Sequence, residues 1–304
     1  MKVGARIVRA FMRLLSLQPL KLHYFWGKCF AFVLNKIMRY RRDVVMINLS
    51  RSFPEKKYWE IKEIAEKFYR HFGRIFVEAV WFAGSWNNKR LEDSEICRYS
   101  NLEVLDGLLA DTPGVILLTS HMGNWELLGG CAHYRNAAGE FPKSFDESTI
   151  AIVYKALSSK LWDRVMLENR CAPAKVPIES GCVESRNIIR FVIRNKGKKN
   201  LYVFPTDQCP YAYAGNHVVD DFLHQATTTM TGGAALAKKH GMAVCYMTMK
   251  EREEGGYDFC FEEICRDASQ HSPEEIMNKF YSLLEKDIQE QPWNYLWTHK
   301  RWKR

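Results

Sequence analysis

The stretch "GVILLTSHMGNWELLGG", residues 114–130, joins a short apolar run to a segment with the composition of a helix. The run 114–120 begins at a glycine, ends in polar residues and is typical of a buried β-strand. Asn124 is a favourable N-cap for a helix that carries Glu126 in its first turn. The stretch therefore predicts a strand, a short loop that contains His121, and a helix.

Similar apolar runs recur along the chain, and helical segments lie between them. Strands are expected at 114–120, 149–154, 200–205, 242–247 and 257–264, and helices at 56–83, 124–134, 158–170, 183–195, 227–240 and from Ser272 to Pro292. This alternation predicts an α/β fold with a mostly parallel or mixed sheet flanked by helices. Because no linker rich in Pro, Gly or Ser is visible, we expect a helical N-terminal region, 1–95, that leads into one α/β domain, 96–304.

The composition excludes several classes of protein. A hydrophobic content of 47% with 26% charged residues is that of a globular chain and not of a disordered one. The nine cysteines are odd in number, and they form neither Cys-x-x-Cys nor a zinc pattern with histidine. We therefore expect reduced core cysteines in a protein that faces the cytosol, and no metal site.

The positive charge is concentrated near the start of the chain. Residues 1–42 hold ten of the 44 basic residues and no acid, so the remaining chain has 34 basic against 35 acidic residues. A nucleic-acid surface draws its charge from a wide face, so this block argues against nucleic acid and favours an anionic membrane surface as partner. The longest uncharged run, between Lys28 and Lys36, is far below the roughly 20 apolar residues of a spanning helix. We expect helices lying in the membrane interface; amphipathic helices packed on the domain with a solvated basic face are the alternative.

His121 lies where a strand ends and a helix begins, a place where α/β proteins build sites. A carboxylate from Glu126 could hold one ring nitrogen and stabilise the imidazolium while the other nitrogen takes a proton from a hydroxyl. The alternative is a packed histidine with Glu126 as a structural acid. No Gly-x-Ser-x-Gly, glycine-rich phosphate loop or His-Glu-x-x-His motif accompanies the pair. The nucleophile would then be a hydroxyl of the substrate.

The motif "HMGNWE", a histidine followed by four residues and an acid, resembles that of the bacterial lipid A late acyltransferases, which belong to the lysophospholipid acyltransferase superfamily. Five further blocks resemble this family in the same order: "RRDVVMINLSRSFPE" (41–55), "VYKALSSKLWDRVMLENR" (153–170), "VFPTDQ" (203–208), "ATTTMTGGAALAKKHGMAV" (226–244) and "NYLWTHKRWK" (294–303). The likeness runs nearly end to end. The segment "DFLHQ" before the threonines departs from the family, so the length of the acyl chain is not carried over.

The resemblance implies a role for each of six residues. His121 would be the general base and Glu126 the acid that orients it; Arg170, Asp207, Lys155 and Asn124 would contact substrate or support the site. Taken alone, Arg170 is a cation at a helix C-terminus, Asp207 a turn residue and Asn124 a structural cap. Lys155 stands where the family usually has arginine, and a lysine cannot make a two-pronged contact to phosphate.

Two further segments have structural interpretations. Residues 227–229, a run of three threonines, would start a helix whose amides could hold an anion. In the C-terminal block we expect packed tryptophans beside solvated Lys300 and Arg301.

The function implied is that of a peripheral enzyme on the cytoplasmic face of a bacterial inner membrane. It would move a fatty acyl chain from a thioester donor, acyl carrier protein, to a hydroxyl of a lipid A precursor, without cofactor or metal. One alternative is an acyltransferase for a lysophospholipid or aminolipid that uses acyl-CoA. The other is a membrane-bound interaction protein with an inactive site.

Overall fold

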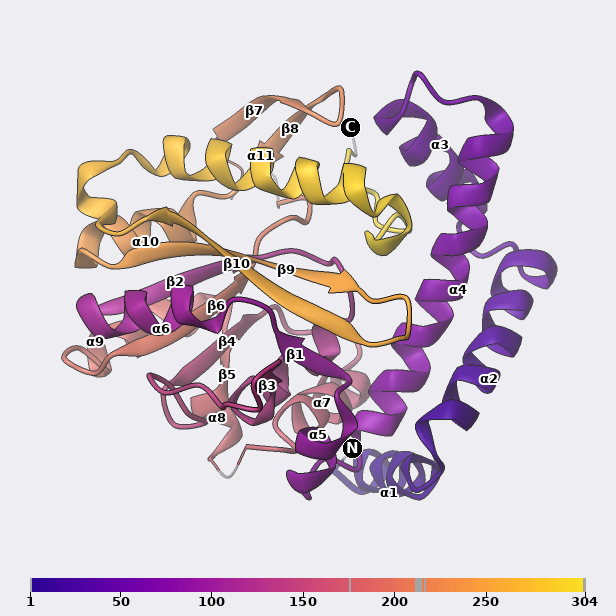
Figure 1. The fold of residues 1–304 in the computed structure, drawn as a ribbon, viewed down its shortest axis with the longest axis horizontal. Coiled ribbons are helices and arrows are strands. Elements are labelled where there is room, and N and C mark those ends of the chain that lie inside the picture. Colours follow the sequence, from indigo (N-terminus) through magenta and orange to yellow (C-terminus); the bar gives the residue numbers. More distant parts are fainter. Residues whose placement is uncertain (1, 175, 211–214, 216, 303–304) are drawn as a thin grey trace.

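The computed structural model describes residues 2–174, 176–210, 215 and 217–302. Its centre is an eight-stranded sheet covered by helices (Figure 1). In spatial order the strands are β3 (Arg135–Asn136), β1 (Cys97–Tyr99), β10 (Tyr257–Cys265), β9 (Ala243–Glu251), β2 (Gly114–Thr119), β6 (Asn200–Pro205), β4 (Ile150–Tyr154) and β5 (Cys182–Glu184). Neighbouring strands are parallel except for the β9–β10 pair, which makes the sheet mixed. The α/β fold class expected from the sequence is confirmed.

The register of the central strands sets the position of the candidate residues. All six residues of β2 are buried, and β2 lies parallel to β6 with Thr119 opposite Pro205. His121 lies two residues after Thr119, and Asp207 lies two residues after Pro205. Both residues therefore lie side by side at the same edge of the sheet. Lys155 follows the end of β4, the other parallel neighbour of β6. Carboxyl ends of adjacent parallel strands meet at one edge, which is where this fold places sites.

Successive residues of a strand point to opposite faces of a sheet, and each face here has its own core. Ile116 and Leu118 of β2 belong to one hydrophobic cluster, and Val115 and Leu117 belong to the other. The first cluster is completed by α9 (Ile188–Arg194), α10 (Gly232–His240) and α11 (Pro273–Glu290), and the second by α6 (Leu102–Asp111), the 3-10 helix η2 (Trp125–His133) and α7 (Lys160–Arg170).

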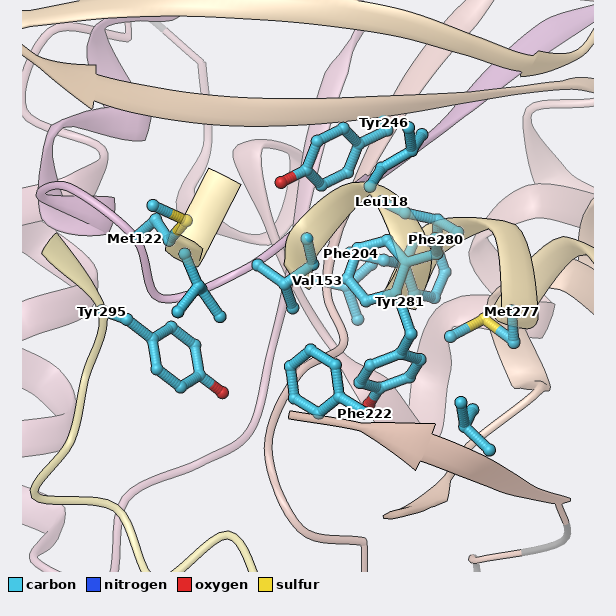
Figure 2. Packing of buried hydrophobic residues seen from close by; sticks show 14 of the residues in the cluster. Leu118, Met122, Val153, Phe204, Phe222, Tyr246, Met277, Phe280, Tyr281 and Tyr295 are labelled. Atoms are coloured by element: carbon cyan, nitrogen blue, oxygen red, sulfur yellow. The ribbon is translucent and has the colours of Figure 1, made fainter. Parts of the chain in front are cut away.

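The first cluster packs aromatic side chains of α11 against the sheet (Figure 2). Phe280 lies edge-on to Tyr246 of β9, and Tyr281 lies edge-on to Phe222. Such fully buried large side chains stabilise a fold by roughly 1.5–3 kcal/mol each. The helix begins where the sequence indicated, because Ser272 caps it and forms a reciprocal capping box with the residue at N3.

Helices precede the sheet in the sequence: α1 (Lys2–Ser16), α2 (Leu20–Phe32), α3 (Arg42–Ser52), α4 (Tyr58–Phe82) and α5 (Lys89–Ser94). Figure 1 shows α2, α3 and α4 together at one end of the α/β layers. Helices α2 and α4 touch through backbone, since a side chain on Gly73 would come within 2.4 Å of the carbonyl oxygen of Gly27. Val45 and Leu49 of α3 are fully buried in the first core cluster.

Helices α3 and α4 therefore share a core with the sheet, whereas Ala5 and Met12 of α1 pack in a separate small cluster with Ala83 and Val165. The boundary expected at residue 95 stays a prediction, although the first strand does begin just after it, at Cys97. Across the described residues, no helix combines the length and the apolar character needed to cross a membrane.

For three segments the predicted type or length of the secondary-structure element was wrong. The three threonines form no helix start: they belong to β8 (Gln225–Thr229), which pairs with β7 (His217–Phe222) in a separate hairpin, and α10 begins only at Gly232. β-branched side chains favour strands, which explains the difference. The helix expected at 183–195 is shortened by β5 and becomes α9. The segment after Asn124 is a 3-10 helix, η2.

Candidate active site

The ring of His121 is held by residues of the loop that follows the neighbouring strand, β6. Its Nδ1 lies 2.7 Å from Oδ1 of Asp207, and its backbone N–H donates to Oδ2 at 3.1 Å. On the other side of the ring, Nε2 of Gln208 donates to Nε2 of His121 at 2.9 Å. The ring also lies edge-on to Trp125, with centroids 4.7 Å apart. His121 is thus fixed on both nitrogens, and both partners come from the loop after β6.

The surroundings of Asp207 determine its charge. Burial acts to raise the pKa of Asp207, but the charge of His121 and hydrogen bonds from its ring and backbone hold the pKa below its usual value. Asp207 is therefore an ionised, 2% exposed carboxylate. An ionised acceptor at Nδ1 keeps the proton on that nitrogen, so Nε2 carries the free lone pair. This is the arrangement of a general base.

Glu126, the acid expected to orient His121, has a different partner. Its two oxygens receive a two-pronged contact from Arg170, from Nε at 2.8 Å and from Nη2 at 2.6 Å, and the indole N–H of Trp125 donates to it at 3.0 Å. The expected contact between Glu126 and His121 is therefore corrected: Asp207 occupies that position. Trp125 lies between the two residues and touches both.

The packing of two helices explains the change of partner. At Gly129 in η2, a side chain would come within 1.8 Å of the carbonyl oxygen of Arg170, so only glycine permits this approach of η2 to the end of α7. The approach brings Glu126 and Arg170 together. Burial acts to lower the pKa of Arg170, and Glu126 outweighs it and raises the pKa. The Arg170 guanidinium, expected to contact substrate or support the site, is thus already paired with Glu126. Its Nη1 is the one nitrogen that lacks a partner among the residues that the structure describes.

Asn124 holds the loop in place. Its side-chain oxygen accepts from the backbone N–H of Glu126 at 3.1 Å, which confirms the predicted N-cap. Its amide donates to the carbonyl oxygen of Ile75 and to Oε2 of Glu78 at 2.9 Å. The side chain is fully buried. These contacts with protein groups support a structural role and not the substrate contact expected from the sequence.

Gly123 forms the turn between His121 and the cap. Its φ is +65°, and a Cβ would come within 2.4 Å of Cβ of Met249, so both conformation and space require glycine. Its N–H donates to Oδ1 of Asn294 at 2.9 Å, and its carbonyl oxygen lies 3.3 Å from Nε2 of His71. The loop that carries His121 is therefore anchored to α4 and to the C-terminal block.

Two further places named from the sequence are Lys155 and the C-terminal block, and the charge of Asp207 acts on Arg301 of that block. Lys155 is exposed at the carboxyl end of β4, at the same edge of the sheet. In the C-terminal block Trp297 is buried as expected, but Arg301 is not solvated. Its Nη2 donates to the carbonyl oxygen of Thr228 at 2.7 Å and to the hydroxyl of Tyr281 at 2.9 Å.

Sequence reasoning missed two residues of the site, Gln208 and His299, and interpreted a third, Trp125 inside "HMGNWE", as structural. Gln208 follows Asp207 in the block "VFPTDQ", so its position was a signal that went unused. His299 accepts a hydrogen bond from the backbone N–H of Cys209 at 3.0 Å and thereby fixes the loop after β6. Only the folded chain brings that residue to the loop.

The described residues contain no group of three or more His, Cys, Asp or Glu side chains placed to hold a metal ion. All nine cysteines are free thiols, and six of them are buried. The site consists instead of a base with a buried carboxylate and an ion pair beside it. These parts can deprotonate a hydroxyl and stabilise the imidazolium that results.

Comparison with known proteins identifies the family of the chain. The profile of the family described as "Bacterial lipid A biosynthesis acyltransferase" matches residues 2–304. Among curated proteins, none matches the chain. Because the match covers nearly the whole sequence, the chain belongs to the bacterial lipid A biosynthesis acyltransferase family.

Proposed function

We propose that this acyltransferase moves a fatty acyl chain from acyl carrier protein to a hydroxyl group of a lipid A precursor, with His121 as the general base. The observation that carries the proposal is the 2.7 Å contact between Nδ1 of His121 and the buried, ionised Asp207. It leaves Nε2 as a proton acceptor at the end of the central strand.

The reaction needs no nucleophile from the protein. Nε2 of His121 takes the proton of the acceptor hydroxyl as its oxygen attacks the thioester carbonyl. The tetrahedral intermediate then collapses, the carbon–sulfur bond breaks, and the thiolate leaves with the proton from the imidazolium. The products are an ester and a free thiol. Asp207 stabilises the imidazolium between the two steps because its charge lies against the ring.

Gln208 has to yield its contact when the acceptor binds. Its amide now donates to the nitrogen that must receive the hydroxyl proton. An incoming hydroxyl can replace it as the donor to Nε2, so the base remains hydrogen-bonded in both states. Arg170 is held beside the site by Glu126, and its Nη1 is placed to donate to a negatively charged oxygen of substrate.

We further propose that the protein binds the cytoplasmic face of the inner membrane through α1 and α2. Large apolar side chains of these helices lie exposed, among them Ile7, Phe11, Phe25, Trp26 and Phe32. Basic residues lie between them, and residues 1–42 contain no acid. An apolar face next to basic side chains fits the interface of an anionic leaflet.

The experiment is an assay of the purified protein in detergent with a lipid A precursor as acceptor. Acyl carrier protein and coenzyme A are compared as carriers of the acyl chain, and mass spectrometry identifies the product. We expect one added acyl ester with the carrier protein as donor, and a loss on the order of 10² to 10⁴ in rate for His121→Ala. A His121→Ala variant with wild-type turnover would exclude His121 as the base.

A further inference from the structure

A cleft of about 410 Å³ lies between α1 and the end of α7, beside the short helix α8 (Ile178–Gly181). Three arginines of α1 line one wall: Arg6, Arg9 and Arg13. Their spacing of three and four residues places them on one face of the helix. The opposite wall contains Glu168 and the residues that follow it at the end of α7. We call this space the arginine cleft.

The cleft holds more positive charge than the protein neutralises. Arg9 pairs with Glu168 at 2.7 Å and donates to its carbonyl oxygen at 3.1 Å, and Arg164 contacts the same carboxylate. Arg6 and Arg13 have no ion-pair partner anywhere in the described part of the chain. Burial lowers the pKa of Arg13, and the nearby charge of Arg9 lowers it further. Two guanidinium groups therefore remain available to an anion.

Guanidinium groups select for phosphate. Each presents N–H donors in a planar fork that matches two oxygens of a phosphate or carboxylate group. Like charges three and four residues apart on a helix repel one another, and among the three arginines Glu168 forms an ion pair with Arg9 alone in the described part of the chain. A phosphate group with several charged oxygens satisfies more of these donors than a single carboxylate does. The arginine cleft thus has the chemistry of a phosphate site.

The flank of α1 beside the arginines indicates where the phosphate comes from. Val3, Ile7, Phe11 and Leu14 are each at least 60% exposed on this flank. If these side chains enter the acyl region of a membrane, the adjacent arginines lie at the depth of the lipid phosphates. We propose that the arginine cleft binds the phosphate group of a membrane lipid. This inference does not depend on the transfer reaction proposed above.

The cleft is also connected to the candidate active site. Cys171 lines it and directly follows Arg170, whose guanidinium is paired with Glu126. A lipid whose phosphate binds in the cleft therefore contacts the chain next to Arg170, the residue that pairs with Glu126 beside His121. Lipids that are acceptors of the acyl group and lipids that only anchor the protein share this phosphate chemistry.

The test compares a double variant with a control that has the same change in charge. Arg6→Gln/Arg13→Gln removes the two unpaired arginines and leaves Arg9 to hold Glu168. Arg190→Gln/Arg194→Gln removes two exposed arginines of α9, far from α1 in Figure 1. All four side chains point to solvent or to the cleft, so both variants should fold, which circular dichroism checks. The single variant Arg6→Gln serves if the double variant does not fold.

Binding is measured to vesicles of a neutral galactolipid, which carries no phosphate, that contain either phosphatidic acid or oleic acid, matched in surface potential. We expect the wild type to prefer phosphatidic acid. Each basic side chain at an anionic surface contributes about fivefold, so Arg6→Gln/Arg13→Gln should bind phosphatidic acid vesicles about 30-fold more weakly, and Arg6→Gln alone about fivefold. The control variant should keep the preference. Equal binding of the wild type to both vesicles, or equal losses in both double variants, would overturn the proposal.

Two further arms separate the source of the phosphate. In the first arm, inorganic phosphate is titrated into the protein without vesicles. If phosphate binding depends on Arg6 and Arg13 while the protein shows no preference between the two vesicles, the cleft binds a free anion and the proposal of a lipid phosphate is refuted. The KM for acyl carrier protein is measured in the same variants. A raised KM with unchanged vesicle binding would show that the cleft docks an acidic protein instead. An inactive enzyme with intact vesicle binding would count against the transfer mechanism and leave the cleft assignment standing.

Discussion

Replacing Asp207 with asparagine tests the histidine–aspartate pair with the least change in shape. Asp207 uses both carboxylate oxygens on one residue: Oδ1 accepts from Nδ1 of His121 at 2.7 Å and Oδ2 accepts from its backbone N–H at 3.1 Å. Asparagine has only one oxygen for these two donors. Its NH₂ group must therefore face either the backbone N–H or the ring.

Each orientation damages the base in a defined way. If the NH₂ group faces Nδ1, that nitrogen becomes an acceptor and the proton moves to Nε2, which then has no lone pair for the hydroxyl. If it faces the backbone, two donors oppose each other in a site that is 2% exposed. In both cases the imidazolium loses the neighbouring negative charge that stabilises it. We expect kcat to fall by roughly 10² to 10⁴, as for loss of a general base.

The assay measures kcat with saturating donor and acceptor, together with the thermal midpoint of unfolding. Asp207→Asn should lower kcat with little change in either KM, because Asp207 acts on the base and not on the substrates. The matched variant Asp207→Glu keeps the charge and should recover part of the activity. If Asp207→Asn turns over at the wild-type rate while folded, Asp207 does not hold a catalytic base, and the proposed mechanism fails.

Three other changes test the surroundings of the pair. Glu126→Gln leaves Arg170 as a poorly solvated cation without its counter-charge, so the free energy of unfolding should fall by about 3–5 kcal/mol. The double variant Glu126→Gln/Arg170→Met should recover much of this loss. If chemical denaturation finds the wild type and both variants equally stable, the buried ion pair does not stabilise the protein. Gln208→Ala removes the amide that donates a hydrogen bond to Nε2 of His121. If the hydroxyl of the acceptor substrate replaces this amide, the KM for the acceptor should fall or stay unchanged. A large loss of kcat would instead assign Gln208 a direct part in the reaction. Burial acts to raise the pKa of Glu251, but His71, Arg74 and Trp293 outweigh it and lower the pKa from 4.5 to about 2. Because the pKa is lower in the folded state, the stabilisation is present above pH 4.5 and is lost as the pH falls toward 2; Glu251→Gln should reduce the free energy of unfolding by about 3 kcal/mol at pH 7 and by much less near pH 2. A difference between the two proteins that does not change with pH would refute this assignment.

Local patterns in the sequence were enough for the elements around the site. The apolar run of β2, the position of His121 after it and the N-cap at Asn124 depend on neighbours within a few residues, which is the range over which strand pattern and helix capping act. The capping box at Ser272 is local in the same way. For the same reason the local pattern predicts a helix start at the run of threonines, whose strand requires a partner in β7.

The partners of the site residues were decided by the tertiary structure. Asp207 meets His121 because β6 lies beside β2 with Thr119 opposite Pro205, and strand order is not encoded in the periodicity of either strand. Glu126 is five residues from His121 in the sequence but binds Arg170, because Gly129 lets η2 approach the end of α7. Sequence spacing measures distance along the chain, whereas an ion pair forms between groups that packing brings within about 4 Å.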